Sequence, residues 1–154
     1  MKLIKVEKSE RSILENLLQL YLHDLSLYYP SPFNPKTGLY EYNIDEYFTN
    51  PHYKAYFILN EDGIAGFALI IIDEEFIRPT EIFVLNQYKG KGLATFALNR
   101  LFEEYSGNWE IKIVPNSKKA EKLWTRLVKE YTNGNYQTER VGTYNRLVIN
   151  FNNK

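Results

Sequence analysis

The feature that most restricts the fold of this 154-residue chain is a pair of apolar segments separated by a short polar turn. Residues 53–59 and 64–72 consist largely of aromatic, β-branched and aliphatic side chains, and Asn60-Glu61-Asp62-Gly63 lies between them. An Asp-Gly pair is typical of tight hairpin turns, because glycine readily adopts a positive φ. The two segments therefore predict a β-hairpin near the middle of the chain.

Helical periodicity is found on both sides of this hairpin. The apolar residues from Ile13 to Leu25 recur at helical spacing, with Ser9 or Ser12 at the N-cap position. Further helices are predicted over about 44–48, 90–105 and 117–131, and strands over 3–8, 80–85, 109–114 and two terminal segments that end at 146–151. No linker or repeat interrupts this order, so we expect a single domain over residues 1–154.

The composition argues against several classes of protein. The chain has no cysteine, which excludes a disulfide framework and a thiolate zinc site, and its two histidines make a metal centre unexpected. Its formal net charge of zero argues against nucleic-acid binding, for which the alternative basis would be Lys112, Lys118, Lys119, Lys122 and Arg126. No apolar run has the length of a signal peptide or a bilayer span. We therefore expect a cytoplasmic protein with no membrane and no nucleic-acid partner.

The charges are distributed unevenly along the chain. Residues 1–85 carry an excess of six acidic side chains, whereas residues 86–131 carry an excess of four basic ones. One interpretation is ordinary surface charge. The other is that the second half binds an anion and the first half a cation.

A glycine-containing turn follows the strand predicted over 80–85. Gln87-x-x-Gly90-x-Gly92 joins the end of this strand to the start of a helix, where unpaired backbone N–H groups favour a phosphate. Lys89 and Lys91 add positive charge to the turn. A plain strand-to-helix connection would show the same glycines. The Rossmann fingerprint is absent, since Thr95 occupies the position of its third glycine.

In its surrounding order of elements, this turn resembles the acyl-CoA-binding turn of the GNAT superfamily of N-acyltransferases, and the resemblance covers nearly the whole chain. A second similarity lies between Asn116 and Trp124, where Ala120 and Trp124 match the family's helix pattern. The resemblance implies an α/β (α+β) GNAT fold, with a mixed, mostly antiparallel central sheet of about six to seven strands and about four helices. It also implies acetyl-CoA as the co-substrate.

The resemblance assigns residues to the cofactor site. Backbone groups of residues 83–85 would pair with the pantetheine arm, and the amides of residues 89–94 would hold the pyrophosphate. Either Asn116 or Ser117 would face the cofactor, and Trp124 would form a wall of the site or pack in the core. The cofactor-binding residues implied are Phe83, Val84, Leu85, Gln87, Lys89, Gly90, Lys91, Gly92, Leu93, Ala94, Asn116 and Trp124.

Glu81 is the predicted catalytic base, because it is the only acid on the strand that leads into the turn. An amine must lose its proton before it attacks a thioester, and a carboxylate can accept that proton. The alternative is that Glu81 pairs with a neighbouring cation. A backbone N–H near Val84 or Leu85 would polarise the acetyl carbonyl. No acid is assigned to the leaving thiolate, because Tyr131 lies about 10 Å beyond Trp124 along the helix.

The acceptor site is predicted in the first half of the chain. Its walls would be His23, Asp24, Tyr28 and Tyr29, with Tyr40 and Tyr42 nearby, although tyrosines scattered at a helix end more often reflect ordinary half-buried packing. Tyrosine rings beside acidic residues suit a cationic amine. The function expected is acetyl transfer from acetyl-CoA to a primary amine of a small molecule or peptide. The alternative is a catalytically silent CoA-binding or interaction domain, and the terminal strands are compatible with a homodimer.

Overall fold

The computed structural model describes residues 1–154 and has a seven-stranded sheet at its centre, with the order β1-β4-β5-β6-β7-β9-β8. The strands are β1 (Lys2–Lys5), β4 (Tyr53–Asn60), β5 (Gly63–Ile72), β6 (Ile77–Val84), β7 (Asn108–Lys112), β8 (Gln137–Val141) and β9 (Arg146–Asn152). The helices are α1 (Arg11–Leu25), α2 (Glu46–Thr49), α3 (Leu93–Glu104) and α4 (Lys118–Thr132). The predicted mixed α/β fold is confirmed. No helix combines the length and the apolar character needed to cross a bilayer.

The predicted hairpin is formed by β4 and β5, which pair from Tyr53↔Ile71 to Asn60↔Gly63. Strand β6 then pairs with β5 in antiparallel register. At Gly66 the two strands approach so closely that a Cβ atom would lie 2.0 Å from the Phe83 carbonyl oxygen. Only glycine allows this approach, so Gly66 sets the position of the strand that carries Glu81.

Strand β6 is longer than the sequence predicts, because it begins at Ile77 and includes Pro79. The register between β5 and β6 shifts at this point, where Leu69 pairs with Glu81 and Ile70 pairs with Pro79. A register shift of this kind can accommodate proline, because the ladder does not need a backbone N–H donor at that position.

The start of α1 also differs from the prediction. A short 3-10 helix over Lys8–Glu10 precedes it, and Glu7 and Glu10 form a reciprocal capping box, with the Glu7 N–H donating to Glu10 Oε1 at 2.9 Å. Neither Ser9 nor Ser12 therefore caps the helix. In the proline-rich segment that follows α1, β2 (Phe33–Asn34) and β3 (Leu39–Tyr40) form a small hairpin that the sequence does not predict.

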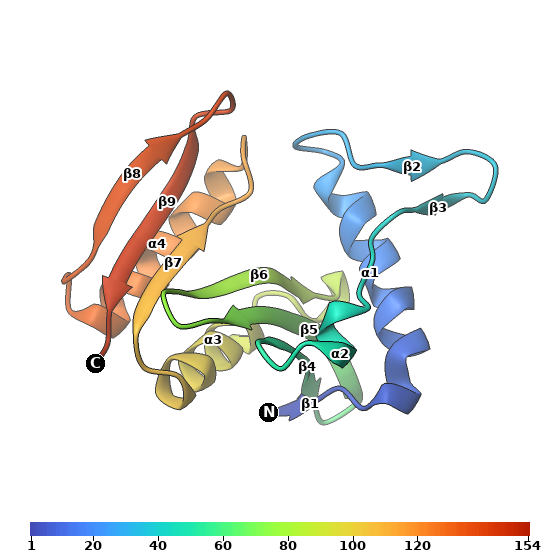
Figure 1. Ribbon diagram of the computed structural model, residues 1–154, viewed down its shortest axis with the longest axis horizontal. Coiled ribbons are helices and arrows are strands. Elements are labelled where there is room, and N and C mark those ends of the chain that lie inside the picture. The colour runs from blue at the N-terminus through green and yellow to red at the C-terminus, as the bar shows by residue number, and fades with distance from the viewer.

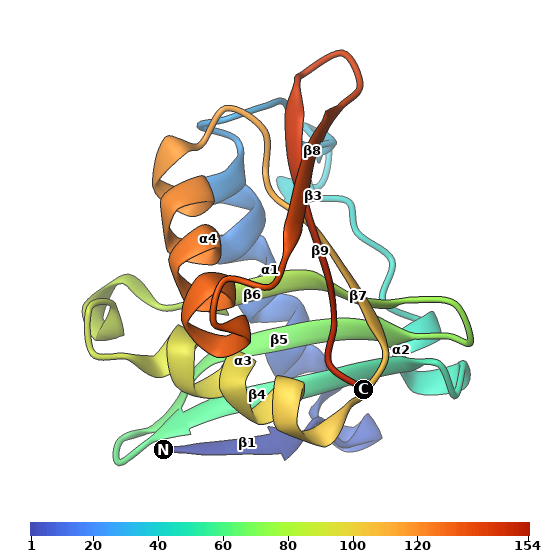
Figure 2. The same cartoon turned by 90° about the vertical axis from the view of Figure 1, so that its left-hand side faces the viewer.

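The sheet is covered on both faces. Figure 2 shows α3 and α1 on opposite sides of β4–β6. On the α1 face, an apolar cluster that includes Leu14, Phe57, Phe67 and Phe83 has no member beyond Leu85. On the other face, a second cluster runs from Tyr56 of β4 through α3 and α4 to β9. The α1 face of the sheet therefore lacks a core over β7–β9.

Strands β6 and β7 are parallel and pair at one position only, Ile77↔Trp109. Beyond it they diverge toward their carboxyl ends, as the green and orange arrows of Figure 1 show. The backbone edges of β6 after Ile77 and of β7 after Trp109 consequently face an opening in the sheet. The carboxyl end of β6 carries both Glu81 and the start of the glycine turn.

Candidate active site

Glu81 points to the α1 face of the sheet, the face to which Phe83 also contributes its side chain. Its Oε2 atom is buried and has no hydrogen-bond partner. Burial raises the pKa of Glu81 to about 7, although the nearby Tyr21 hydroxyl and the positive charge of Arg146 both act to lower it. No lysine or arginine forms an ion pair with Glu81. This carboxyl group can therefore exchange a proton near neutral pH.

Four tyrosines from three segments surround this carboxyl group: Tyr21 of α1, Tyr29 after α1, and Tyr42 and Tyr47 beside and within α2. Burial raises the pKa of each hydroxyl, and the negative charge of Glu81 raises it further. All four hydroxyls are therefore neutral groups that can both donate and accept hydrogen bonds.

Packing fixes the orientation of two of these rings. The Tyr21 ring contacts Phe67 and Phe83 edge-on, with ring centres 5.6 and 5.7 Å apart. The Tyr47 hydroxyl lies 2.7 Å from Thr80 Oγ1, next to Glu81 in the chain. The surroundings of Glu81 are thus apolar in their walls and polar only at a few fixed hydroxyls, an arrangement that is typical of small-molecule sites.

The predicted acceptor residues separate into two groups. Tyr29 lies beside Glu81, and Tyr28 contributes its backbone carbonyl, which accepts a hydrogen bond from Asn116 Nδ2 at 2.9 Å. His23 is exposed and its Nδ1 lies 3.0 Å from the Tyr40 hydroxyl, in a separate hollow with β2 and β3. Two residues of helix rotate a side chain by about 200°, which turns His23 away from the face of Tyr21. Asp24, three residues after Tyr21 on α1, is half-buried and forms no ion pair.

Arg146 reaches the same site from the other half of the sheet. It is half-buried at the start of β9, and its Nε atom donates to the Ile113 carbonyl oxygen at 2.8 Å. Its positive charge acts to lower the pKa of both Glu81 and Tyr29, against the larger effect of burial, which raises both. The sequence contains no local signal for this role, because a strand pairing between distant segments places Arg146 here. Tyr21 and Tyr47 were likewise missed, since their spacing is that of ordinary helix packing.

The glycine turn presents a row of unpaired backbone donors. Gly90 and Gly92 have φ angles of 77° and 81°, and Gly92 is the N-cap of α3 without any side-chain cap. The six N–H groups from Gly90 to Thr95 have no acceptor within the chain. A Cβ atom at either glycine would meet nothing within 4 Å, so the outer side of the turn is open. These residues fit the pyrophosphate of a nucleotide cofactor.

The strand before the turn offers fewer free backbone groups than the sequence predicts. The Leu85 N–H donates to the Ala65 carbonyl at 2.8 Å, and the Leu85 carbonyl accepts from Tyr88. Leu85 is therefore not available as a carbonyl-polarising donor. Because successive peptide groups of a strand point to opposite edges, this bond leaves the backbone of Val84 facing the opening beside β7 and that of Phe83 facing β5.

The residues at the start of α4 are also engaged within the chain. Ser117 is buried and caps the helix by accepting the Ala120 N–H at 3.1 Å. Asn116 has a φ of 66° and uses its side-chain amide for the Tyr28 carbonyl, so a contact with the cofactor stays a prediction that requires release of this bond. Trp124 is half-buried against the cluster on the α3 face.

Tyr131 does not face the opening. Its hydroxyl donates to the Phe102 carbonyl at 3.4 Å and receives Asn153 Nδ2 at 3.2 Å. These contacts hold it in the core beneath α3, which agrees with the absence of an assigned acid for the leaving thiolate.

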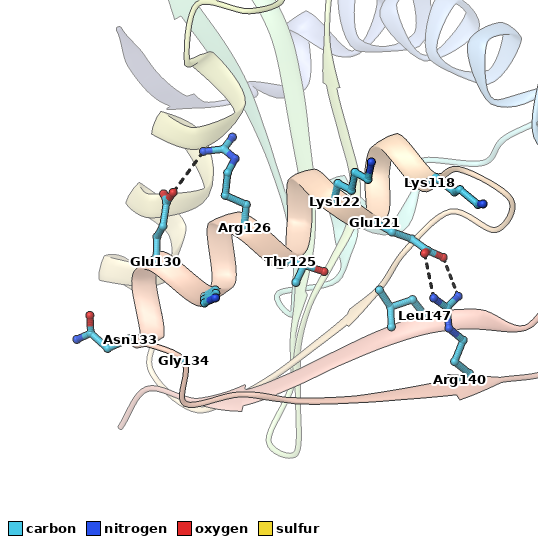
Figure 3. Close-up of a pocket in the computed structure, with 11 residues that line it drawn as sticks. Lys118, Glu121, Lys122, Thr125, Arg126, Glu130, Asn133, Gly134, Arg140 and Leu147 are labelled. Atoms are coloured by element: carbon cyan, nitrogen blue, oxygen red, sulfur yellow. Dashed lines mark hydrogen bonds and ion pairs between the residues drawn. The ribbon is translucent and has the colours of Figure 1, made fainter.

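A second hollow lies between α4 and the β8–β9 hairpin. This open groove of about 980 Å³ is lined mainly by charged side chains, and Glu121 bonds both terminal nitrogens of Arg140 there, at 2.8 and 3.0 Å (Figure 3). Leu147 lines the groove, whereas Arg146, its neighbour on β9, points to the opposite face of the sheet. The groove is therefore separate from the site around Glu81. Nowhere in the chain do three His, Asp or Glu side chains gather as metal ligands would.

Residues 16–128 match the family model of the Acetyltransferase (GNAT) family. The chain belongs to this family. Among curated proteins no sequence matches it significantly. The family match includes Glu81, the glycine turn and the start of α4, and ends before Arg146.

Solved structures of acetyltransferases share the fold over nearly the full length. An acetyltransferase from Thermus thermophilus has 12% identity and a TM-score of 0.67, with 99% of this chain and 96% of that chain covered. An aminoglycoside 6'-N-acetyltransferase complexed with coenzyme A has 11% identity and a TM-score of 0.62, with coverage of 99% and 97%. A GNAT acetyltransferase from Staphylococcus aureus has 12% identity and a TM-score of 0.61, with 99% of both chains covered.

Proposed function

We propose that this GNAT-family chain transfers the acetyl group of acetyl-CoA to a primary amine of a small molecule or peptide, in the cytoplasm. The observation that carries the proposal is the Glu81 carboxyl group, which has a buried Oε2 atom without a hydrogen-bond partner and a pKa raised to about 7, at the place where the sheet opens. The family match supports the acetyl transfer, and the free N–H groups of Gly90–Thr95 support the cofactor.

Different groups of residues bind different parts of acetyl-CoA in this proposal. The amides of Gly90–Thr95 hold the pyrophosphate at the positive end of α3, and Lys89 and Lys91 add charge beside it. Gln87 is exposed at the rim of this turn. The Val84 N–H faces the opening, where it can polarise a carbonyl oxygen. Bound acetyl-CoA supplies an acetyl thioester that a neutral amine can attack.

Glu81 prepares the amine for this attack. A lysine-like amine has a pKa of about 10.4, so it is almost fully protonated near neutral pH. Glu81 accepts the ammonium proton directly or through one water molecule. The amine nitrogen then bonds to the acetyl carbon while the carbon–sulfur bond breaks, and the nitrogen loses its second proton to solvent as the amide forms. The departing sulfur takes a proton from solvent, because Tyr131 is held in the core and an indole N–H is not a usable acid.

The acceptor lies on the α1 face, between Glu81 and the surrounding tyrosines. Tyr29 contacts it directly in this proposal, and Tyr28 holds Tyr29 in place through its bond to Asn116. His23, which is exposed beside β3, and Asp24 next to it are proposed for the outer end of a longer acceptor. The aminoglycoside acetyltransferases of the same fold support a small-molecule acceptor.

Thiol release and thermal unfolding test the proposal together. Acetyl-CoA at 100 times its dissociation constant should stabilise the fold by about 2.7 kcal/mol, and a mixture of primary amines should then release free CoA thiol. Stabilisation with no thiol release from any amine would indicate the silent CoA-binding domain instead. No stabilisation by acetyl-CoA would overturn both functions.

A further inference from the structure

Arg146 carries a positive charge that no side chain of this protein neutralises. Its Nε atom donates to the Ile113 carbonyl, and the two terminal nitrogens of the guanidinium group have no acceptor in the chain. Arg146 takes part in none of the ion pairs. By comparison, Arg140 on the same hairpin uses its terminal nitrogens for Glu121. Arg146 therefore presents a fixed fork of free donors.

This fork lies at the reaction site. Arg146 is close enough for its charge to act on Glu81 and on Tyr29, but it does not reach ion-pair distance from Glu81. The two side chains form no ion pair, and Glu81 Oε2 is a buried carboxyl oxygen without a hydrogen-bond partner. The two unsatisfied groups have opposite requirements: Glu81 needs a donor, and Arg146 needs an anion.

We propose that the acceptor is an amine that also bears a carboxylate, and that Arg146 binds this carboxylate while Glu81 receives the amine. This inference rests on the proposed function. A guanidinium fork matches the two oxygens of a carboxylate, and such charge-assisted bonds are among the strongest in proteins. One zwitterion a few bonds long, such as an α-amino acid or the terminus of a short peptide, would satisfy both groups together.

The same charge disfavours polycationic acceptors. An acceptor that carries several ammonium groups and no anion would place one of them near the uncompensated Arg146. This chain should therefore differ from the aminoglycoside acetyltransferases that share its fold.

Matched pairs of amines test the inference. The pairs are L-phenylalanine with 2-phenylethylamine, L-lysine with cadaverine, and an alanyl-phenylalanine dipeptide with its C-terminal amide. Thiol release should give kcat/KM values about 10- to 100-fold higher for the carboxylate members, the range expected for a charged hydrogen-bonded pair. Preference for the free amino acids or for the dipeptide identifies the source of the carboxylate.

Substitution of Arg146 supplies the control. Arg146→Met should raise KM for the carboxylate members by the same factor and leave the other amines within about threefold. Arg146→Lys should recover part of the loss, and Arg140→Met, which removes the guanidinium group on the opposite face, should change neither. Loss of the Arg146 charge raises the pKa of Glu81 for both members of a pair alike, so an indirect effect on the base leaves the ratio of their kcat/KM values unchanged.

The outcomes separate the inference from the proposed function. Turnover of amines without preference for the carboxylate members, or an equal loss for both members in Arg146→Met, would overturn the inference alone. If no amine is acetylated, the proposed function fails, and calorimetric titration of the same pairs into the CoA-loaded protein then decides the inference. Equal binding, or no binding, of both members would refute it.

Discussion

At the scale of single residues, the surroundings of Glu81 control its affinity for a proton. Its neighbours on the same sheet face are apolar, its Oε2 atom is unpartnered, and the nearest cation remains beyond ion-pair distance. Burial therefore outweighs the positive charge, and the pKa rises to about 7. A carboxyl group in this state is suited to base catalysis near neutral pH.

Glu81→Gln should lower kcat/KM at pH 7 by about 100-fold or more, because general base catalysis contributes this much. The wild-type profile should level off above pH 7 once Glu81 is ionised. The variant should instead keep rising toward the pKa of the amine. Initial-rate profiles of thiol release check this, with Glu61→Gln in the exposed hairpin turn as the control. An unchanged profile would exclude Glu81 as the base.

The same carboxyl group should make folding depend on pH. Its pKa is about 7 in the folded chain and 4.5 as the ordinary value, so folding takes up a proton between these limits. Stability contributed by the neutral form is thus present below pH 4.5 and is lost as the pH rises through 7. The loss amounts to roughly 3 kcal/mol.

Glu81→Gln removes this dependence, since the amide does not ionise. Denaturant unfolding at pH 8 should show the variant to be more stable than the wild type, and the difference should shrink toward pH 5. A variant that is less stable than the wild type at pH 8 would contradict the burial argument.

At the scale of elements, the turn between β6 and α3 combines two glycines at positive φ with six free N–H groups. Residue type alone predicts this turn, because the glycine spacing is local. The hairpin of β4 and β5 is predictable for the same reason. The hairpin of β2 and β3 is not, since two residues per strand leave no periodicity to recognise.

Gly90→Glu should weaken acetyl-CoA binding about fivefold or more, because a like charge within a few ångströms costs on the order of 1 kcal/mol in water. Gly142→Glu at the tip of the β8–β9 hairpin is the matched control, since its φ of 72° imposes the same strain as the 77° of Gly90. Calorimetric titration with acetyl-CoA measures both. Equal affinities in the two variants would refute the phosphate turn.

At the scale of the whole molecule, one contact joins the two halves across the opening. The Asn116 side chain, before α4, donates to the Tyr28 carbonyl, after α1. The sequence predicts Glu81 and the glycine turn that follows it. It predicts neither the contact of Asn116 with Tyr28 nor the position of Arg146. Both depend on how β7 and β9 are placed against β6, which only the assembled fold determines.

Asn116→Gly removes this contact while preserving the left-handed backbone, for which φ is 66°. The acceptor KM should rise about 3- to 10-fold, as expected for the loss of one hydrogen bond that positions Tyr29. The affinity for acetyl-CoA should remain within about twofold. Asn133→Gly, at a φ of 54° at the other end of α4, is the control. A loss of acetyl-CoA affinity in Asn116→Gly would favour the predicted cofactor contact of Asn116 instead.

Glu81 and α3 lie on opposite faces of the sheet, and this placement bears on the kinetic mechanism of the proposed transfer. Glu81 opens on the α1 face, whereas α3, which follows the phosphate-holding turn, packs on the other. We therefore expect donor and acceptor to enter from different sides and to be bound at the same time. The acetyl group passes between them in a ternary complex, and no side chain has to carry it. Double-reciprocal plots for the two substrates should consequently intersect, as they do for sequential rather than ping-pong kinetics.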